Sequence, residues 1–125
     1  LSPRYAHAAR LRDAPASALA GEAVLHTTSR PQAWPRWFDA QGLDAGTLQT
    51  GATFDHLTYL LEAAVAGLGV AIAPQELVQA DLDSGRLLAP WGFVDTGGEW
   101  ALCAVRGNQD PRIAALAAWL RTTLA

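Results

Sequence analysis

The sequence contains no methionine, no lysine and a single cysteine, and only 17% of its 125 residues are charged. With Cys103 alone an internal disulfide is excluded, which is typical of proteins in a reducing compartment. The nine basic residues are arginines scattered along the chain, and the formal net charge is −3. Because contacts to a phosphate backbone need clustered positive charge, the sequence argues against an autonomous nucleic-acid-binding domain.

Long apolar runs and a secretory leader are also missing. A membrane-spanning helix needs roughly 18 uninterrupted apolar residues, whereas the best candidate stretch, 60–74, is interrupted by Glu62 and two glycines. The chain begins in folded-type sequence, without an initiating methionine and without a basic and then apolar leader. We therefore expect a cytoplasmic location, no contact with a membrane, and a chain that is a fragment of a longer protein.

Half of the residues are hydrophobic, which is enough for one packed domain. Their pattern predicts helices that alternate with about five strands, and therefore an α/β fold with a mixed sheet. The expected strands cover 23–27, 48–53, 70–73, 87–91 and 100–105, the last of them after a turn at Gly97-Gly98. The expected helices cover 3–11, 33–40, 74–80 and 112–124, with a further helix between Asp55 and Gly67.

The segment from Phe54 to Pro74 is the most informative part of the chain. Asp55 is a residue type that caps helix N-termini, and Phe54 before it is placed to pack on Tyr59 as a hydrophobic staple. The leucine and alanine spacing that follows predicts one apolar helical face, and Gly67 suits the left-handed position that ends a helix. The apolar run 70–73 then predicts a short strand covered on both faces.

Two places in this arrangement favour ligand binding. The helix after Phe54 presents free backbone N–H groups and a dipole that favours an anion, unless Asp55 only caps its own helix. The turn after the first strand lies where ligands of α/β proteins bind, and Arg30 in that turn either pairs with a carboxylate or is a plain surface charge. The candidate ligand-binding residues are Thr27, Thr28, Arg30, Phe54, Asp55 and His56.

Enzymatic and metal chemistry find little support in the sequence. The three histidines, His7, His26 and His56, lack the spacing of metal ligands, so we predict no metal and no cofactor. No G-x-S-x-G nucleophile motif is present, and the glycines before 70–73 precede a strand, whereas a dinucleotide motif follows one. Cys103 lies in an expected apolar strand and is predicted to be a buried small side chain. We expect a protein that is not an enzyme.

Five segments, in order along the chain, carry a resemblance to a known family. The pattern F-x-H, an apolar helix ending in EAA and then AGLGVAIAP, occupies Phe54 to Pro74. LHTTSRPQAWPRWF precedes it, and DLDSGRLLAPW, WALCAV and RIAALAAWL follow. Together they cover roughly Ser2 to Leu124 and resemble the effector-binding domain of LysR-type transcriptional regulators, in the branch named for the glycine-cleavage activator.

This resemblance implies a periplasmic-binding-protein-like (type 2) fold, in which two lobes enclose a ligand cleft. Residues 1–91 are expected to form the second lobe, and residues 92–125 to contain the crossover and the C-terminal strand and helix of the first lobe. The N-terminal winged helix-turn-helix and the rest of the first lobe would lie outside this C-terminal fragment. In the family, the segments at Thr27, Thr28 and Phe54 to His56 line the cleft.

The function that the resemblance implies is effector sensing. A small molecule bound between the lobes shifts their arrangement and thereby modulates transcription. Self-association as a dimer or tetramer is expected, and DNA is expected to be reached only through the missing N-terminal domain. Two alternatives stay open: a solute-binding lobe of a transport system, which shares the fold, and an oligomerisation module.

Overall fold

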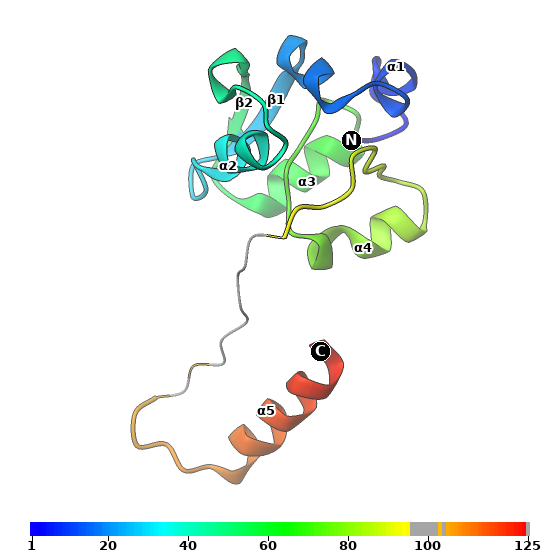
Figure 1. Cartoon of the computed structure of the whole chain (residues 1–125). Coiled ribbons are helices and arrows are strands. Elements are labelled where there is room, and N and C mark those ends of the chain that lie inside the picture. The colour runs from blue at the N-terminus through cyan, green and yellow to red at the C-terminus, as the bar shows by residue number, and fades with distance from the viewer. Residues whose placement is uncertain (96–102, 104, 125) are drawn as a thin grey trace. The chain divides into compact units, whose positions relative to one another are not determined.

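The computed structural model describes residues 1–95, 103 and 105–124 (Figure 1). They fall into two compact units, Leu1–Val94 and Asp95–Ala125. The elements of the first unit are α1 (Ala8–Arg12), the 3-10 helix η1 (Ala16–Gly21), β1 (Ala23–Thr27), α2 (Ala33–Ala40), the 3-10 helix η2 (Ala45–Thr47), β2 (Gln49–Phe54), α3 (Leu57–Val65) and α4 (Gln75–Asp83). The second unit contains α5 (Pro111–Leu124). Helices alternate with strands, as the α/β prediction requires.

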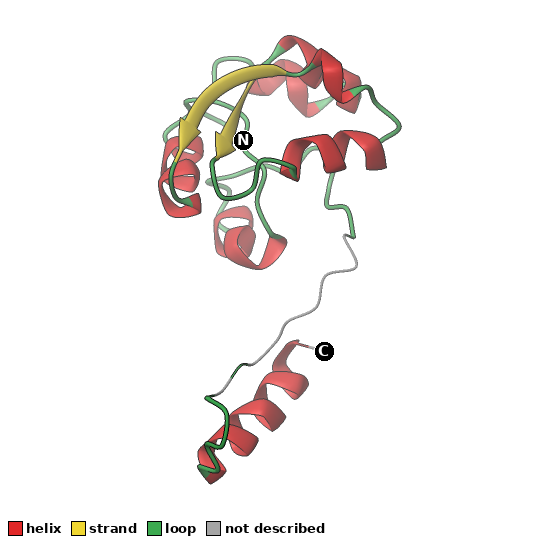
Figure 2. Ribbon diagram, turned by 90° about the vertical axis from the view of Figure 1, so that its left-hand side faces the viewer, coloured by secondary structure: helices red, strands yellow, loops and turns green. Residues whose placement is uncertain are grey.

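The strands β1 and β2 run parallel and lie side by side (Figure 2). Their register pairs Ala23 with Gln49 at one end and Thr27 with Phe54 at the other, and it shifts by one residue between Val24 and His26. On the other side of β1, Val70 forms a parallel bridge to Val24. The β1 strand is therefore the middle one, between β2 and the chain at Val70.

Helices cover both faces of this small sheet. On one face, Val24 belongs to a core that also contains Trp34 and Phe38 of α2. On the other face, Leu25 packs in a core with Leu60 of α3, among others. Alternate side chains of β1 thus enter different cores, as the two-residue period of a strand dictates.

The predicted strands are confirmed in part. The prediction for 23–27 is confirmed, and the one for 48–53 is confirmed with a shift of one residue. The run 70–73 is covered on both faces, since Val70 and Ala71 pack in different cores, but only Val70 makes a bridge. The prediction of a full strand there is wrong, because the pairing with β1 is limited to Val70, and Pro74 at the end of the run has no N–H to extend a ladder.

The segment 87–91 is tied to the start of the chain instead of forming a strand. Leu88 donates its N–H to the carbonyl of Leu1 at 2.7 Å, and the N-terminal amine of Leu1 donates to the carbonyl of Leu88 at 3.1 Å. A turn follows, closed by the N–H of Gly92 on the carbonyl of Ala89 at 3.1 Å. The beginning and the end of the first unit are therefore adjacent.

The first predicted helix begins later than expected. Ser2 forms a turn, in which its hydroxyl accepts the N–H of Arg4 at 3.0 Å and its carbonyl accepts that of Tyr5 at 3.0 Å. The α-helix itself starts only at Ala8. The prediction that Ser2 caps this helix is therefore wrong, because the N-cap of α1 is His7 and Ser2 closes a separate turn before it. The expected extent 3–11 is also too long at its start.

The turn after α3 confirms the special role of Gly67. Gly67 has φ +87°, and its N–H donates to the carbonyl of Ala64 at 3.0 Å. The N–H of Leu68 reaches back to Ala63 at 3.1 Å, which completes a left-handed helix end. A Cβ on Gly67 would stand 3.0 Å from the carbonyl carbon of Arg4. The residue must be glycine both for its conformation and for its close approach to the N-terminal segment.

The second unit is described mainly by α5, which confirms the helix expected at 112–124. Ile113, Ala117 and Leu120 are partly buried, whereas Leu116 and Trp119 are 46% and 60% exposed. The predicted turn at 97–98 and most of the strand 100–105 lie outside the described residues. Cys103 is described and is exposed, so the prediction of a buried cysteine is wrong. No helix in the described part of the chain is long and apolar enough to cross a membrane.

Candidate functional site

The parallel pairing of β1 and β2 brings the two predicted ligand-binding segments together. Thr27 and Phe54 are register partners at the ends of their strands, and the N–H of Thr28 donates to the carbonyl of Phe54 at 3.0 Å. Both strands therefore end at the same edge, as Figure 2 shows. Two segments about 27 residues apart in sequence meet where α/β proteins bind ligands.

The six candidate residues differ in what they offer at this edge. Thr27 is 7% exposed, and Phe54 is half-buried against the core under α3, so these two form the base of the site. The remaining four, Thr28, Arg30, Asp55 and His56, are exposed. The turn that carries Arg30 is held by its N–H, which donates to the carbonyl of Thr27 at 3.3 Å. A ligand at this edge would meet the last four side chains.

The N-terminus of α3 carries no side-chain cap. The N-cap is His56, in an extended conformation with φ −130° and ψ 145°, and its side chain makes no capping bond. The prediction that Asp55 caps the helix is therefore wrong, because β2 continues to Phe54 and α3 starts one residue later than expected. The free N–H groups of the first turn and the helix dipole remain available to an anion.

Tyr59 also departs from its predicted role. It is 57% exposed, and its ring contacts that of His56 with 5.8 Å between the centroids. This position does not fit the expected staple with Phe54. The exposed rings of His56 and Tyr59 instead contact each other at the first turn of α3.

Charges at the edge have both signs. Neither Arg30 nor Asp55 has an ion-pair partner among the described residues. Both side chains are exposed and follow neighbouring strands. The edge therefore offers a guanidinium and a helix N-terminus to an anionic group, and a carboxylate to a cationic one.

His26 is a residue near the site that sequence reasoning left out. It is the residue before Thr27 and pairs in register with Thr53. Its Nε2 atom is enclosed by the protein and has no hydrogen-bond partner in the described part of the chain. Burial lowers the pKa of His26 below its usual 6.5. The signal in the sequence was a polar residue next to the end of an otherwise apolar strand.

A buried carboxylate lies away from this edge, just before β1. Glu22 is 2% exposed and accepts hydrogen bonds from the hydroxyl of Tyr5 at 2.6 Å and from Nδ1 of His7 at 2.8 Å. The guanidinium of Arg10 forms an ion pair with it. All three donors belong to the N-terminal segment, so this cluster fastens that segment to the sheet and has a structural role.

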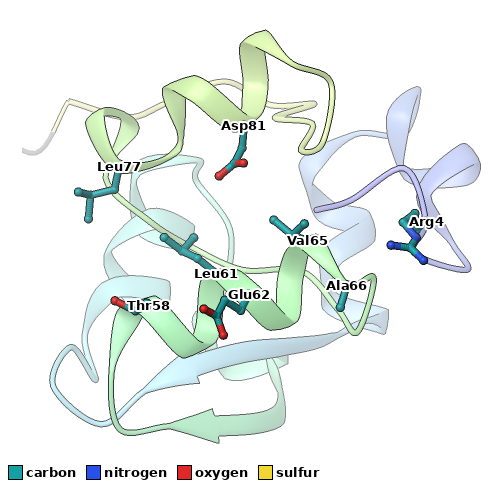
Figure 3. Close-up of a pocket in the computed structure, with 8 residues that line it drawn as sticks. All are labelled: Arg4, Thr58, Leu61, Glu62, Val65, Ala66, Leu77 and Asp81. Atoms are coloured by element: carbon teal, nitrogen blue, oxygen red, sulfur yellow. The ribbon is translucent and has the colours of Figure 1, made fainter.

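An open hollow of about 580 Å³ lies between α3 and α4 (Figure 3). Arg4 stands at one end, and apolar side chains such as Leu61 and Leu77 line its walls. Its lining includes Thr58 but none of the six predicted residues. This hollow is therefore separate from the strand edge. In the part of the chain that is described, no group of three or more His, Cys, Asp or Glu side chains could hold a metal ion.

Comparison with known proteins decides the family. The model of the LysR substrate binding domain matches residues 1–125, which is the whole chain. This chain belongs to the LysR substrate-binding domain family. The HTH-type transcriptional regulator TrpI of Pseudomonas aeruginosa is 57% identical over 125 residues, which are 100% of this chain and 42% of that protein. The glycine cleavage system transcriptional activator of Escherichia coli is 31% identical over 104 residues, or 82% of this chain and 34% of that protein.

A solved structure extends the likeness to three dimensions. The effector domain of the transcriptional regulator AmpR of Pseudomonas aeruginosa is similar with a TM-score of 0.73 and 30% identity, over 90% of this chain and 54% of that chain. The LysR-type assignment, its glycine-cleavage-activator-like branch and the periplasmic-binding-protein-like fold class are thereby confirmed. This LysR substrate-binding domain chain spans less than half the length of the two curated relatives.

Proposed function

We propose that the chain is the effector-sensing part of a bacterial LysR-type DNA-binding transcriptional regulator, and that it is not an enzyme. The observation that carries this proposal is the Thr28–Phe54 hydrogen bond, because it sets the exposed turn after β1 beside the uncapped N-terminus of α3. The names of TrpI and AmpR as transcriptional regulators support the same function. No observation favours a transport role.

In this proposal residues 1–91 form the second lobe, and residues 92–125 contain the crossover and the C-terminal part of the first lobe. The mutual hydrogen bonds of Leu1 and Leu88 support it, because a lobe joined to another by two crossings needs its entry and exit side by side. The β1–β2 edge then faces the cleft between the lobes.

The ligand in this proposal is a small, amino-acid-like carboxylate. The free N–H groups of α3 and the guanidinium of Arg30 receive its carboxylate, since both favour negative charge. Asp55 receives its ammonium group, and the Thr28 and His56 side chains add hydrogen bonds from either side. The buried side chain of Thr27 and the half-buried side chain of Phe54 pack into the protein and hold the backbone of the two strand ends in place.

Binding acts through a shift of population. The effector favours one lobe arrangement over the other only by as much as its affinity for the two differs. The regulator is a cytoplasmic dimer or tetramer in this proposal, and its contact with DNA is made by a helix-turn-helix outside this chain, as the name of TrpI suggests.

The test uses the full-length regulator and isothermal titration calorimetry with L-glutamate, L-serine and succinate. Leu57 is the first residue of α3 and follows an extended residue, so proline is tolerated there. Leu57→Pro removes one free N–H together with the leucine side chain, whereas the matched control Leu57→Ala removes the side chain contacts alone. We expect at least one probe to bind, and Leu57→Pro to weaken it about tenfold more than Leu57→Ala.

Two results would overturn the proposal. If none of the three compounds bound the wild-type regulator, the proposal that the effector is an amino-acid-like carboxylate would be refuted. If the proline and alanine variants bound the probes with equal affinity, the proposed contact between the ligand and the N-terminus of α3 would be refuted.

A further inference from the structure

His26 lies on the face of the sheet that α2 covers. Val24 packs with Trp34 of α2, and Leu25 packs on the opposite side with Leu60. From the pair Val24–Thr50 to the pair His26–Thr53, the chain advances by two residues in β1 and by three in β2. The extra residue therefore belongs to β2, and the alternation of side chains along β1 is undisturbed. The imidazole of His26 therefore stands on the same face as Val24, one residue from the end of the strand.

The two ring nitrogens of His26 are in different environments. Nε2 is enclosed and has no partner among the described residues. The residue as a whole is only partly buried, and Nδ1 has no hydrogen bond among the described residues yet is not a fully buried unpaired atom, so solvent reaches it. The ring thus turns one nitrogen inward and leaves the other on the accessible side.

This arrangement selects one form of the ring. A protonated imidazole would carry an N–H on each nitrogen, and the inner one would have no acceptor. Buried backbone N–H groups are left without a partner more rarely than buried backbone carbonyls, which indicates that an unpaired donor is tolerated less well than an unpaired acceptor. The inner Nε2 is therefore best left as a bare lone pair, with the single proton on Nδ1.

We propose that His26 is a further ligand-contact residue, which donates a hydrogen bond from Nδ1 to an oxygen of the effector. This inference rests on the proposed function, because it assumes a small carboxylate at the edge formed by β1 and β2. It extends the site from the Thr27 side of β1 to the side that α2 covers. It also gives the site specificity, since a neutral Nδ1–H raises the affinity for a ligand with a hydrogen-bond acceptor at that point relative to a ligand without one.

The first arm of the test needs no ligand. Long-range ¹H–¹⁵N spectra of the ¹⁵N-histidine-labelled full-length regulator at pH 7 report the tautomer of each histidine, and His26→Gln identifies the signals of His26. We expect a neutral ring with the proton on Nδ1. A ring with the proton on Nε2, or a charged ring, would overturn the inference whether or not any probe binds.

The second arm compares two variants that keep one nitrogen each. The amide nitrogen of His26→Asn occupies the place of Nδ1, whereas that of His26→Gln occupies the place of Nε2. With L-glutamate, L-serine and succinate as probes in calorimetry, we expect His26→Asn to bind within about threefold of wild type. We expect His26→Gln to lose about tenfold or more, the range of a hydrogen bond to a charged group.

The outcomes separate this inference from the proposed function. Wild-type binding with both variants unchanged, or with both equally weakened, would refute the contact by Nδ1 and leave the proposed function standing. No binding of any probe to the wild type would refute both. Selective loss in His26→Gln, together with the Nδ1–H tautomer, would support both.

Discussion

Replacing Gly67 by alanine tests how tightly the N-terminal segment packs on the end of α3. At φ +87° a residue with a Cβ costs about 1–2 kcal/mol of strain. The added Cβ would also stand 3.0 Å, 3.1 Å and 3.2 Å from the carbonyl carbon, carbonyl oxygen and Cβ of Arg4. Two of these are backbone atoms that cannot rotate away, and forced overpacking costs about 1–3 kcal/mol more. Gly67→Ala should therefore lower the free energy of unfolding by about 2–5 kcal/mol.

Gly85 supplies the matched control. It has φ +77°, but nothing lies within 4 Å of the position of its Cβ. Gly85→Ala should show the strain alone, about 1–2 kcal/mol. Urea unfolding of the three proteins, followed by far-ultraviolet circular dichroism, gives both differences from the transition midpoints. If Gly67→Ala and Gly85→Ala were equally destabilising, the close packing of Arg4 on the turn would be refuted.

The remaining predictions concern buried polar groups. Trp34→Phe leaves the carbonyl of Leu25 in β1 without its indole donor and should cost about 1–3 kcal/mol in urea unfolding. Trp37→Phe breaks no such bond among the described residues, so equal losses would contradict this. Glu22→Gln removes the charge that three donors share and should cost about 1.5–3 kcal/mol, against less than about 0.5 kcal/mol for the exposed Glu62→Gln. Burial lowers the pKa of His26 in the folded protein below the 6.5 of the unfolded chain. Between these two pKa values the unfolded chain binds more protons than the folded protein does. The contribution of His26 to the free energy of unfolding is therefore fully present above pH 6.5 and is lost as the pH drops through this window. Urea midpoints from pH 8 to pH 5 should lose this part of the pH dependence in His26→Asn, and an unchanged profile would refute it.

The sequence predicted well where local pattern decides structure. The strand at 23–27 and the helix at 33–40 match β1 and α2 to the residue, because apolar residues and clear stop signals flank them. Gly67 was recognised because a left-handed helix end needs glycine. The closeness of the segments at Thr27 and Phe54 was implied by the family resemblance, and the two residues are register partners in the structure.

Prediction failed where a distant contact decides. Pairing with Thr27 extends β2 to Phe54, and that one residue moves the N-cap from Asp55 to His56. The buried Glu22 draws its donors from residues 5 to 10, and no short-range pattern announces such a cluster. The burial of Nε2 of His26 without a hydrogen-bond partner is not encoded in residue spacing either. Each of these features belongs to tertiary structure and leaves only a faint trace in the sequence.

The most direct test of a ligand site at the edge of β1 and β2 is a backbone amide NMR titration of the intact effector domain with L-glutamate, L-serine and succinate. We predict that the largest shifts occur at Thr28, Arg30, His56 and Leu57, whose N–H groups lie at this edge or in the first turn of α3. Residues of the separate hollow, such as Leu61 and Leu77, should shift little. Shifts concentrated at the hollow, or none at Thr28 and His56, would contradict the account.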